Sequence, residues 1–236
     1  ITVVNTCSVT NQALKKSLLA VKKLAKSNPE NRIFVTGCAS EIYPEIFKKI
    51  KSVDRIISNK NKTNKDFYKS PSTLKKLHES HTSYIFPAPS KKLSGRTRAL
   101  LQIQQGCDHS CTFCIIPSGR GESISLPLGG IMQNISKYID WGYQEVVLTG
   151  VDITSYGNDL PGKPRLGNVI KRILKLQPKL KRIRLSSLDP AEIDEDLLEV
   201  IKFDNRVLPH VHFSVQSGDD LILKRMKRRH STSQLL

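Results

Sequence analysis

The segment Gly106-Cys107-Asp108-His109-Ser110-Cys111-Thr112-Phe113-Cys114 places three cysteines in a Cys-x3-Cys-x2-Cys run, directly after an apolar stretch at residues 99–104. A structural zinc site normally has four protein ligands, whereas a [4Fe–4S] cluster has four iron corners. Three thiolates would therefore hold a cluster and leave one iron open to a substrate or cofactor. A zinc site is the alternative, but it needs a fourth ligand, and His109 lies between two of the cysteines, too close for an easy tetrahedral geometry.

Strand and helix patterns alternate on both sides of this run, which predicts an α/β fold with parallel sheets. The predicted strands cover residues 1–5, 32–36, 55–58, 99–104, 145–149, 182–186 and 211–215. The predicted helices cover residues 11–27, 41–51, 129–138, 167–176 and 192–201, and a further helix begins at Asp219. The cysteine run follows the first strand of the second group, at the place where the loops of a β/α barrel form its catalytic face.

The patterns divide the chain into three parts. Residues 1–60 form a parallel α/β domain, and residues 61–94, rich in Lys, Ser, Asn and Pro, form a connecting region with a candidate helix at 73–78. Residues 95–236 contain four β/α units, which are too few to close a barrel. We therefore expect a partial β/α barrel in the last part.

The composition indicates a nucleic-acid partner. The chain has 38 Lys and Arg against 21 Asp and Glu, a formal charge of +17, which attracts polyanions. A merely basic, solvated surface is the alternative. No apolar run approaches the roughly 20 residues that span a bilayer, and the start lacks a signal-peptide pattern. Five cysteines, three of them clustered, argue against a secreted disulfide framework, so we expect a cytoplasmic protein without a membrane partner.

Two further cysteines each follow a predicted strand. Cys7 comes after the strand at 1–5, and Cys38 comes after the strand at 32–36. The carboxyl ends of parallel strands meet at one edge of a sheet, so the two thiols could share a second metal centre. Two small buried side chains are an equally good interpretation, since free cysteine is often buried.

The cysteine run resembles that of the radical S-adenosylmethionine (SAM) enzymes, and its neighbours resemble the methylthiotransferase family within them. The matching segments are Asn-Thr-Cys-Ser-Val-Thr-Asn at 5–11, Val-Thr-Gly-Cys-Ala at 35–39, residues 106–117, Val-Leu-Thr-Gly-Val-Asp-Ile at 147–153 and residues 209–229. They follow the order of the family and cover nearly the whole chain. Residues 8–11 and 149–153 are most similar to the branch that adds a methylthio group to N6-threonylcarbamoyladenosine beside the anticodon of tRNA.

The resemblance implies a role for each candidate residue. Cys107, Cys111 and Cys114 would ligate the radical cluster, while Cys7 and Cys38 would be ligands of an auxiliary [4Fe–4S] cluster in a flavodoxin-like N-terminal domain. The radical, generated from S-adenosylmethionine, would abstract hydrogen from the adenine ring, and a second SAM would supply the methyl group. Thr149, Gly150 and Asp152 would contact the methionine moiety of SAM, with Ser187 and Gln216 as further cofactor or substrate contacts. A reductant protein such as a flavodoxin or a ferredoxin would deliver the electron.

The chain also departs from the family pattern. By the resemblance, a third auxiliary cysteine would lie on a strand before Ile1, and the later barrel strands and an RNA-binding domain would lie after Leu236. Within the chain, Leu126 replaces a usual Arg, and Gly129-Gly130 replaces an acidic helix start. An inactive or split-gene fragment is therefore one alternative, and a non-catalytic zinc-containing RNA-binding protein is another. Two basic stretches, 165–184 and 224–229, are candidate RNA contacts, with solvated surface as the alternative.

Overall fold

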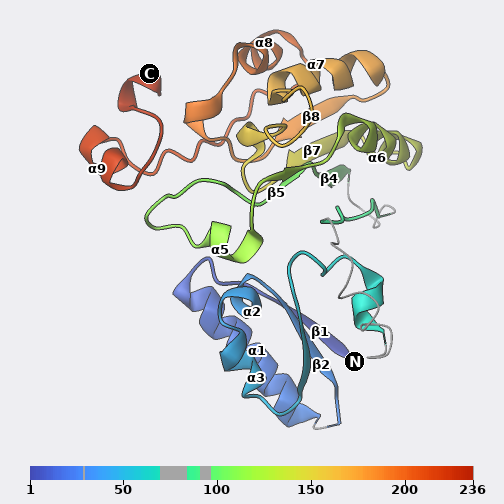
Figure 1. Ribbon diagram of the computed structural model, residues 1–236. Coiled ribbons are helices and arrows are strands. Elements are labelled where there is room, and N and C mark those ends of the chain that lie inside the picture. The colour runs from blue at the N-terminus through green and yellow to red at the C-terminus, as the bar shows by residue number, and fades with distance from the viewer. Residues whose placement is uncertain (29, 70–83, 91–96, 236) are drawn as a thin grey trace. The chain divides into compact units, whose positions relative to one another are not determined.

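The computed structural model describes residues 1–28, 30–69, 84–90 and 97–235, in two compact units. The first unit comprises residues Ile1–Ile85 and Cys114–Gly121, and the second comprises Phe86–Phe113 and Glu122–Leu236. The helix predicted at 73–78 lies outside the described residues. Both units contain parallel sheets with helical connections, so the predicted α/β class is confirmed (Figure 1).

The first unit is a three-stranded parallel sheet in the order β1-β2-β3. Its strands are β1 (Thr2–Thr6), β2 (Ile33–Gly37) and β3 (Val53–Ile57), and its helical segments are α1 (Asn11–Ser27), α2 (Cys38–Ile42), α3 (Pro44–Lys48), η1 (Lys65–Tyr68) and α5 (Ile116–Arg120). The central strand β2 is buried throughout, and Val21 of α1 and Phe47 of α3 pack against it. Thr10 caps α1 by accepting a hydrogen bond from the Ala13 amide.

One predicted helix is wrong, because the chain breaks it before Pro44. The sequence pattern predicted a single helix at 41–51, whereas the structure has α2 and α3, separated at Tyr43. A residue before proline is disfavoured in the helical region, and Tyr43 accordingly has φ −126° and ψ 55°. Pro44 then occupies the first position of α3, where its missing N–H costs nothing.

The second unit is built on the parallel sheet β4-β7-β8. Its strands are β4 (Arg98–Gln102), β7 (Glu145–Thr149) and β8 (Arg182–Leu185), and a short antiparallel pair joins β5 (Gln104–Gln105) to β6 (Ile124–Ser125). Its helical segments are α6 (Leu128–Asp140), η2 (Ile153–Ser155), α7 (Leu166–Leu176), η3 (Pro190–Glu192), α8 (Glu195–Phe203), α9 (Asp220–Arg225) and η4 (Thr232–Gln234). Apolar side chains of α6, α7 and α8 pack on the strands to form one core.

Three sequence predictions need correction in this unit. The strand predicted at 99–104 is divided into β4 and β5 by Ile103, whose amide donates to the Thr149 carbonyl. The helix predicted at 192–201 begins only at Glu195, because the Asp194 side chain caps it. The strand predicted at 211–215 is reduced to a single bridge between Leu188 and Phe213. The helix predicted to begin at Asp219 is confirmed, since that side chain caps α9.

Candidate metal centre

The loop that carries Cys107 leaves β5 and returns to β6. Gly106 turns the chain with φ 78°, a conformation that glycine adopts without strain. The Asp108 carboxylate then accepts a hydrogen bond of 2.9 Å from the Ser123 amide, which ties the loop to the start of the returning segment. The side chains of Cys107 and Cys111 are both partly exposed.

The carboxyl end of β7 brings Asp152 to this loop. The Asp152 Oδ2 lies 3.9 Å from the Cys107 Sγ and 2.7 Å from the His109 Nε2. The hydrogen bond with Asp152 raises the pKa of His109, although burial opposes it. Burial works to raise the pKa of Asp152, but hydrogen bonds from His109, Ser155 and Thr154 together lower it. Both shifts favour an imidazolium–carboxylate pair beside Cys107.

A chain of polar contacts continues from this pair to the second cysteine. Ser155 Oγ lies 2.8 Å from Asp152 Oδ2 and also contacts Glu192, which pairs with Arg229. Asp189 Oδ2 lies 3.3 Å from Arg229 Nη2 and 3.0 Å from Arg228 Nη2. Arg228 Nη1 donates to Cys111 Sγ at 3.6 Å. Residues from the loops after β7 and β8 and from the segment after α9 therefore converge on the cysteine loop.

Gln104 belongs to the candidate site, although the sequence pattern does not single it out. Its buried Oε1 accepts hydrogen bonds from the amides of Val151 and Asp152, at 2.9 and 2.8 Å. Its Nε2 donates to the Gly106 carbonyl at 2.8 Å and to Ser123 Oγ at 2.9 Å. Gly150 leaves room for this side chain, because a Cβ there would lie 2.8 Å from Gln104 Oε1. One amide group thus fixes the Cys107 loop against the Asp152 loop.

The structure brings only some of the site residues predicted after the cysteine run close to the Cys107 loop. Asp152 joins the cysteine loop, and Thr149 and Gly150 lead into it at the end of β7. Ser187 is exposed, and its hydroxyl pairs with His212 Nδ1 at 2.8 Å. Gln216 is also exposed, with φ 71°. The structure gives neither Ser187 nor Gln216 a contact with Cys107 or Asp152 among the hydrogen bonds of the described residues.

Cys7 and Cys38 lie at one edge of the first sheet. Thr6 and Gly37, the residues just before them, are register partners at the ends of β1 and β2. Cys38 is buried, and its Sγ accepts from Arg120 Nε at 3.1 Å and from Asn59 Nδ2 at 3.8 Å. Cys7 is exposed. Cys114, which is partly exposed, opens the segment Cys114–Gly121 that belongs to this unit.

The contact between His109 and Asp152 does not have the spacing of two zinc ligands. Cys107, His109 and Asp152 are the one close group of three metal-binding side chains in the part of the chain that the structure describes. Two ligands of a tetrahedral zinc ion, with bonds near 2.0–2.1 Å, lie about 3.3 Å apart. His109 Nε2 and Asp152 Oδ2 are closer than that, at 2.7 Å, because they are bonded to each other. The interpretation of Cys107, Cys111 and Cys114 as the ligands of a cluster stays a prediction.

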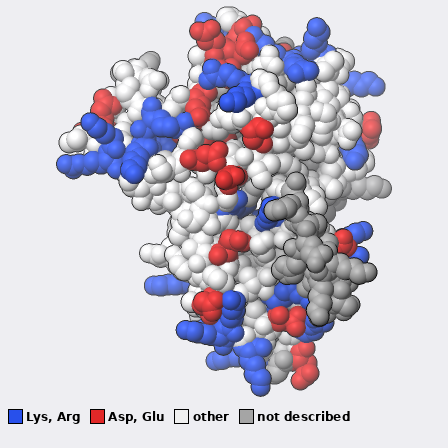
Figure 2. Space-filling model, viewed as in Figure 1, with Lys and Arg blue, Asp and Glu red and all other residues white. Residues whose placement is uncertain are grey.

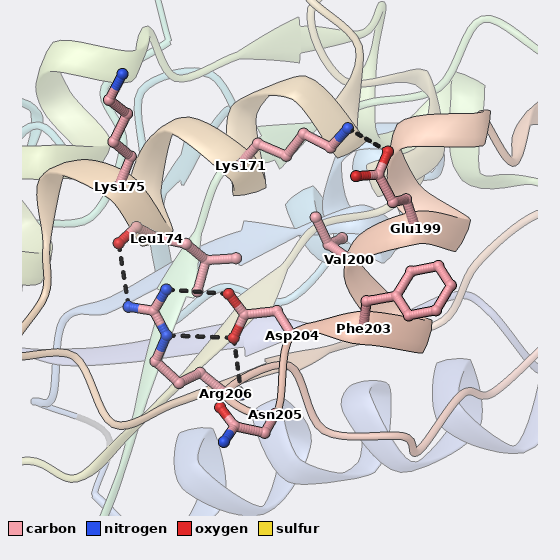
Figure 3. Close-up of a pocket in the computed structure, with 9 residues that line it drawn as sticks. All are labelled: Lys171, Leu174, Lys175, Glu199, Val200, Phe203, Asp204, Asn205 and Arg206. Atoms are coloured by element: carbon pink, nitrogen blue, oxygen red, sulfur yellow. Dashed lines mark hydrogen bonds and ion pairs between the residues drawn. The ribbon is translucent and has the colours of Figure 1, made fainter.

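A surface groove of about 670 Å³ lies elsewhere in the second unit, at the carboxyl ends of α7 and α8 (Figure 3). Arg206 spans it, donating to the Leu174 carbonyl at 3.0 Å and pairing with Asp204 at 3.0 Å. Its nine lining residues include none of the cysteine loop or of the polar chain described above. The groove is a structural feature of the helix ends.

Among the described residues, none of the helices has both the length and the apolar character needed to cross a membrane.

Comparison with known proteins identifies two family matches. Residues 101–236 match the family described as the radical SAM superfamily, and residues 1–58 match an uncharacterized protein family, UPF0004. Threonylcarbamoyladenosine tRNA methylthiotransferase MtaB of Rickettsia prowazekii is 44% identical over 100% of this chain and 56% of its own length. The protein of the same name from Bacillus subtilis is 32% identical, over 97% of this chain and 52% of its own.

Other relatives have different names. A tRNA-2-methylthio-N(6)-dimethylallyladenosine synthase of Endomicrobium trichonymphae is 30% identical over 100% of this chain and 55% of its own length. The chain spans about half the length of the curated relatives it matches. Among solved structures, the radical SAM methyltransferase TsrM of Kitasatospora setae, with tryptophan and a SAM analogue bound, has a TM-score of 0.67 at 10% identity, covering 99% of this chain and 52% of its own. That likeness concerns the fold alone.

Proposed function

Because the chain belongs to the radical SAM superfamily, we propose that it is part of a tRNA methylthiotransferase that acts on N6-threonylcarbamoyladenosine. The observation that carries the proposal is the Cys107 loop, held against Asp152 by Gln104 at the carboxyl edge of the parallel sheet. The name of the 44% identical relative supports the choice of substrate. The dimethylallyladenosine enzyme at 30% identity supports the same chemistry on a different adenosine.

Cys107, Cys111 and Cys114, three cysteines within eight positions, would hold a [4Fe–4S] cluster. Such a cluster, when bound, supplies the electron that cleaves S-adenosylmethionine to a 5′-deoxyadenosyl radical. Cys7 and Cys38, side by side at the edge of the first sheet, are the proposed ligands of an auxiliary [4Fe–4S] cluster.

The residues around the Cys107 loop have roles that follow from their contacts. Asp152 is buried and keeps its charge through hydrogen bonds from His109, Ser155 and Thr154. A fixed carboxylate at this position suits the ammonium group of the methionine moiety. Thr149 and Gly150 bring the backbone to the same place, and Gln104 fixes it there. Ser187 and Gln216, exposed after β8 and before α9, remain candidates for contacts to SAM or to the nucleotide.

The basic surface supports tRNA as the partner. Figure 2 shows Lys and Arg side chains distributed over both units, with a concentration over the α9 segment. Within the stretch 165–184, Lys175, Lys179 and Lys181 are exposed. Within 224–229 the expectation is wrong for Arg228, whose side chain is 7% exposed and pairs with Asp189. A reductant protein such as a flavodoxin or a ferredoxin would supply electrons, and a protein that modifies tRNA would be expected in the cytoplasm.

Anaerobic reconstitution with iron and sulfide tests the proposal. We expect about four irons for one cluster and about eight for two. A Cys107→Ser variant should lose the first set, and Cys38→Ser should affect only the second. Zinc bound without sulfide would contradict the radical SAM assignment. The reconstituted chain is then incubated with SAM, dithionite and tRNA carrying threonylcarbamoyladenosine to measure activity. Formation of the methylthio product supports the proposal. A loaded cluster without product supports the alternative of an inactive fragment.

A further inference from the structure

Arg228 is buried beside a proposed cluster ligand. Its side chain is 7% exposed, and its Nη1 points to Cys111 Sγ at 3.6 Å. Its Nη2 donates to the Ser214 carbonyl at 2.7 Å and pairs with Asp189 at 3.0 Å. The Nε of this guanidinium has no hydrogen-bond partner among the described residues. Within the part of the chain that the structure describes, the hydrogen bonds of the Arg228 side chain are therefore made through its two terminal nitrogens.

Arg228 shares its carboxylate partner with a second arginine. A buried guanidinium requires an anionic partner, since removing its hydration costs several kcal/mol. Its carboxylate, Asp189, is shared with Arg229, which lies 3.3 Å from the same oxygen. Arg229 has a second acid in Glu192, but Arg228 does not among the described residues. The Cys111 sulfur is a further acceptor for this guanidinium, whose N–H groups bind anionic acceptors strongly.

The backbone holds Arg228 in this place. Lys227 has φ 56°, which turns the chain back after α9, and the Arg228 amide donates to the Leu223 carbonyl at 2.9 Å. Leu223 anchors α9 in the protein interior. On the cysteine loop, the Thr112 amide donates to the Met226 carbonyl at 3.2 Å. The loop and the α9 segment are thus joined both through the backbone and through the contact of Arg228 with Cys111.

We propose that Arg228 is a positioning residue that holds Cys111 as a cluster ligand and raises the reduction potential of that cluster, with Asp189 fixing its orientation. The proposal rests on the proposed function, in which Cys111 is a ligand. Hydrogen bonds to ligand sulfurs and nearby positive charge both stabilise the reduced, more negative form of an iron–sulfur cluster. A cluster that must be reduced before it reacts with SAM benefits from such a neighbour.

The experiment compares clusters reconstituted anaerobically in the wild-type chain and in Arg228→Gln, Arg228→Lys, Asp189→Asn and Arg225→Gln. Iron and sulfide are counted first, and the midpoint potential is then measured by dye-mediated titration with electron paramagnetic resonance. Arg225 is the matched control, because it is exposed and its side chain makes no hydrogen bond to a cysteine among the described residues. Arg228→Gln should lower the reduction equilibrium constant about tenfold, or about 59 mV for one electron. Arg228→Lys and Asp189→Asn should give smaller decreases, and Arg225→Gln none.

Each outcome bears on a different claim. A wild-type chain that binds no iron and sulfide would overturn both the proposed function and this inference. A loaded wild-type cluster with an unchanged potential in Arg228→Gln would overturn this inference alone. Loss of iron from Arg228→Gln with an unchanged circular dichroism spectrum would support the holding role. If Arg228→Gln fails to fold, the potentials of Arg228→Lys and Asp189→Asn decide, and equality of both with wild type contradicts the proposal.

Discussion

At the scale of single residues, some residues of the candidate site can be predicted from the sequence and others cannot. The three cysteines are recognisable because thiolate spacing within one loop is itself a chemical signal. Gln104 gives no such signal, since its partners are backbone amides 47 and 48 positions later in the chain. Arg228 lies in the basic stretch 224–229, which the sequence makes a candidate for RNA contacts or for solvated surface, whereas the fold turns its side chain inward to Asp189. Charge in a sequence does not reveal which side of the chain faces water.

Replacing Gln104 with leucine should destabilise the second unit by at least about 2 kcal/mol, because buried amides left without a partner cost about 1–3 kcal/mol each. The amides of Val151 and Asp152 both lose their acceptor in this variant. Trp141, the single tryptophan, belongs to this unit, so its fluorescence during urea unfolding follows the relevant transition. Gln133→Leu, at an exposed position of α6, is the control and should have a small effect. Equal midpoints for the two variants would show that Gln104 does not hold the loops together.

At the scale of elements, glycines decide how closely neighbouring segments pack. Gly130 of α6 accommodates Leu126, since a Cβ at position 130 would lie 2.8 Å from a Leu126 methyl carbon. The two departures from the family pattern noted in the sequence, Leu126 and the glycine pair, are thus in contact. Gly167 of α7 has a stricter role, because a Cβ there would overlap the backbone of α8 at Leu197. Sequence periodicity predicted both helices, but such close approaches depend on the packing of elements far apart in the chain.

Alanine substitutions at Gly167 and Gly129 should change stability in opposite directions. Each glycine is the second residue of its helix, α7 or α6, and alanine is favoured over glycine in helices by up to about 1 kcal/mol. Gly129→Ala should therefore stabilise, because nothing lies within 4 Å of the added Cβ. Gly167→Ala should destabilise by about 1–3 kcal/mol, as overpacked sites do. The measurement is again urea unfolding followed by Trp141, and a stabilised Gly167→Ala variant would refute the close packing of α7 on α8.

The end of α8 should contribute a pH-dependent term to stability. The side-chain hydrogen bond with Arg206 lowers the pKa of Asp204 below its ordinary value of 3.8, despite some opposing desolvation (Figure 3). A carboxyl whose folded pKa is depressed stabilises the protein above its unfolded pKa and loses that contribution as the pH falls through the folded value. Asp204→Asn should therefore be less stable than wild type at pH 6, by less than about 1 kcal/mol for a partly exposed pair. The difference should shrink steadily below pH about 4. A difference that stays constant between pH 6 and pH 3 would exclude the ionised carboxylate as its cause.

At the scale of the whole molecule, the sequence pattern places residues 114–121 in the second α/β part, at 95–236. The structure groups them with the first unit, where Gly119 approaches Cys38 so closely that a Cβ would lie 3.0 Å from the Cys38 Cβ. Asn59 reinforces this packing by donating to the Gly119 carbonyl. Only tertiary contacts, which a linear pattern does not contain, assign this segment. Within the cysteine run, Cys107 and Cys111 therefore belong to the second unit, and Cys114 belongs to the first.

The net charge of +17 indicates where RNA could bind only when cations paired with acids are distinguished from exposed, unneutralised ones. Lys171 lies in the basic stretch 165–184, but its ammonium pairs with Asp196 at 2.7 Å and Glu199 at 2.6 Å. Lys175, Lys179 and Lys181 in the same stretch are exposed. Removing one lysine–phosphate pair should reduce the slope of log affinity against log salt by about 0.7–0.9. The triple variant Lys175→Gln, Lys179→Gln, Lys181→Gln should therefore reduce the slope of log tRNA affinity against log salt, measured by fluorescence anisotropy, by up to about 2–3.

Lys171→Gln provides the matched control, since it removes one positive charge from the same helix as Lys175 but from a group already neutralised by its two acids. The slope should hardly change for this variant. If Lys171→Gln and the triple variant reduced the slope by the same amount per lysine, the effect would come from net charge acting over a distance. If neither changed it, the stretch 165–184 would be solvated surface. Only a reduction confined to the exposed lysines identifies this stretch as a surface that neutralises phosphates directly.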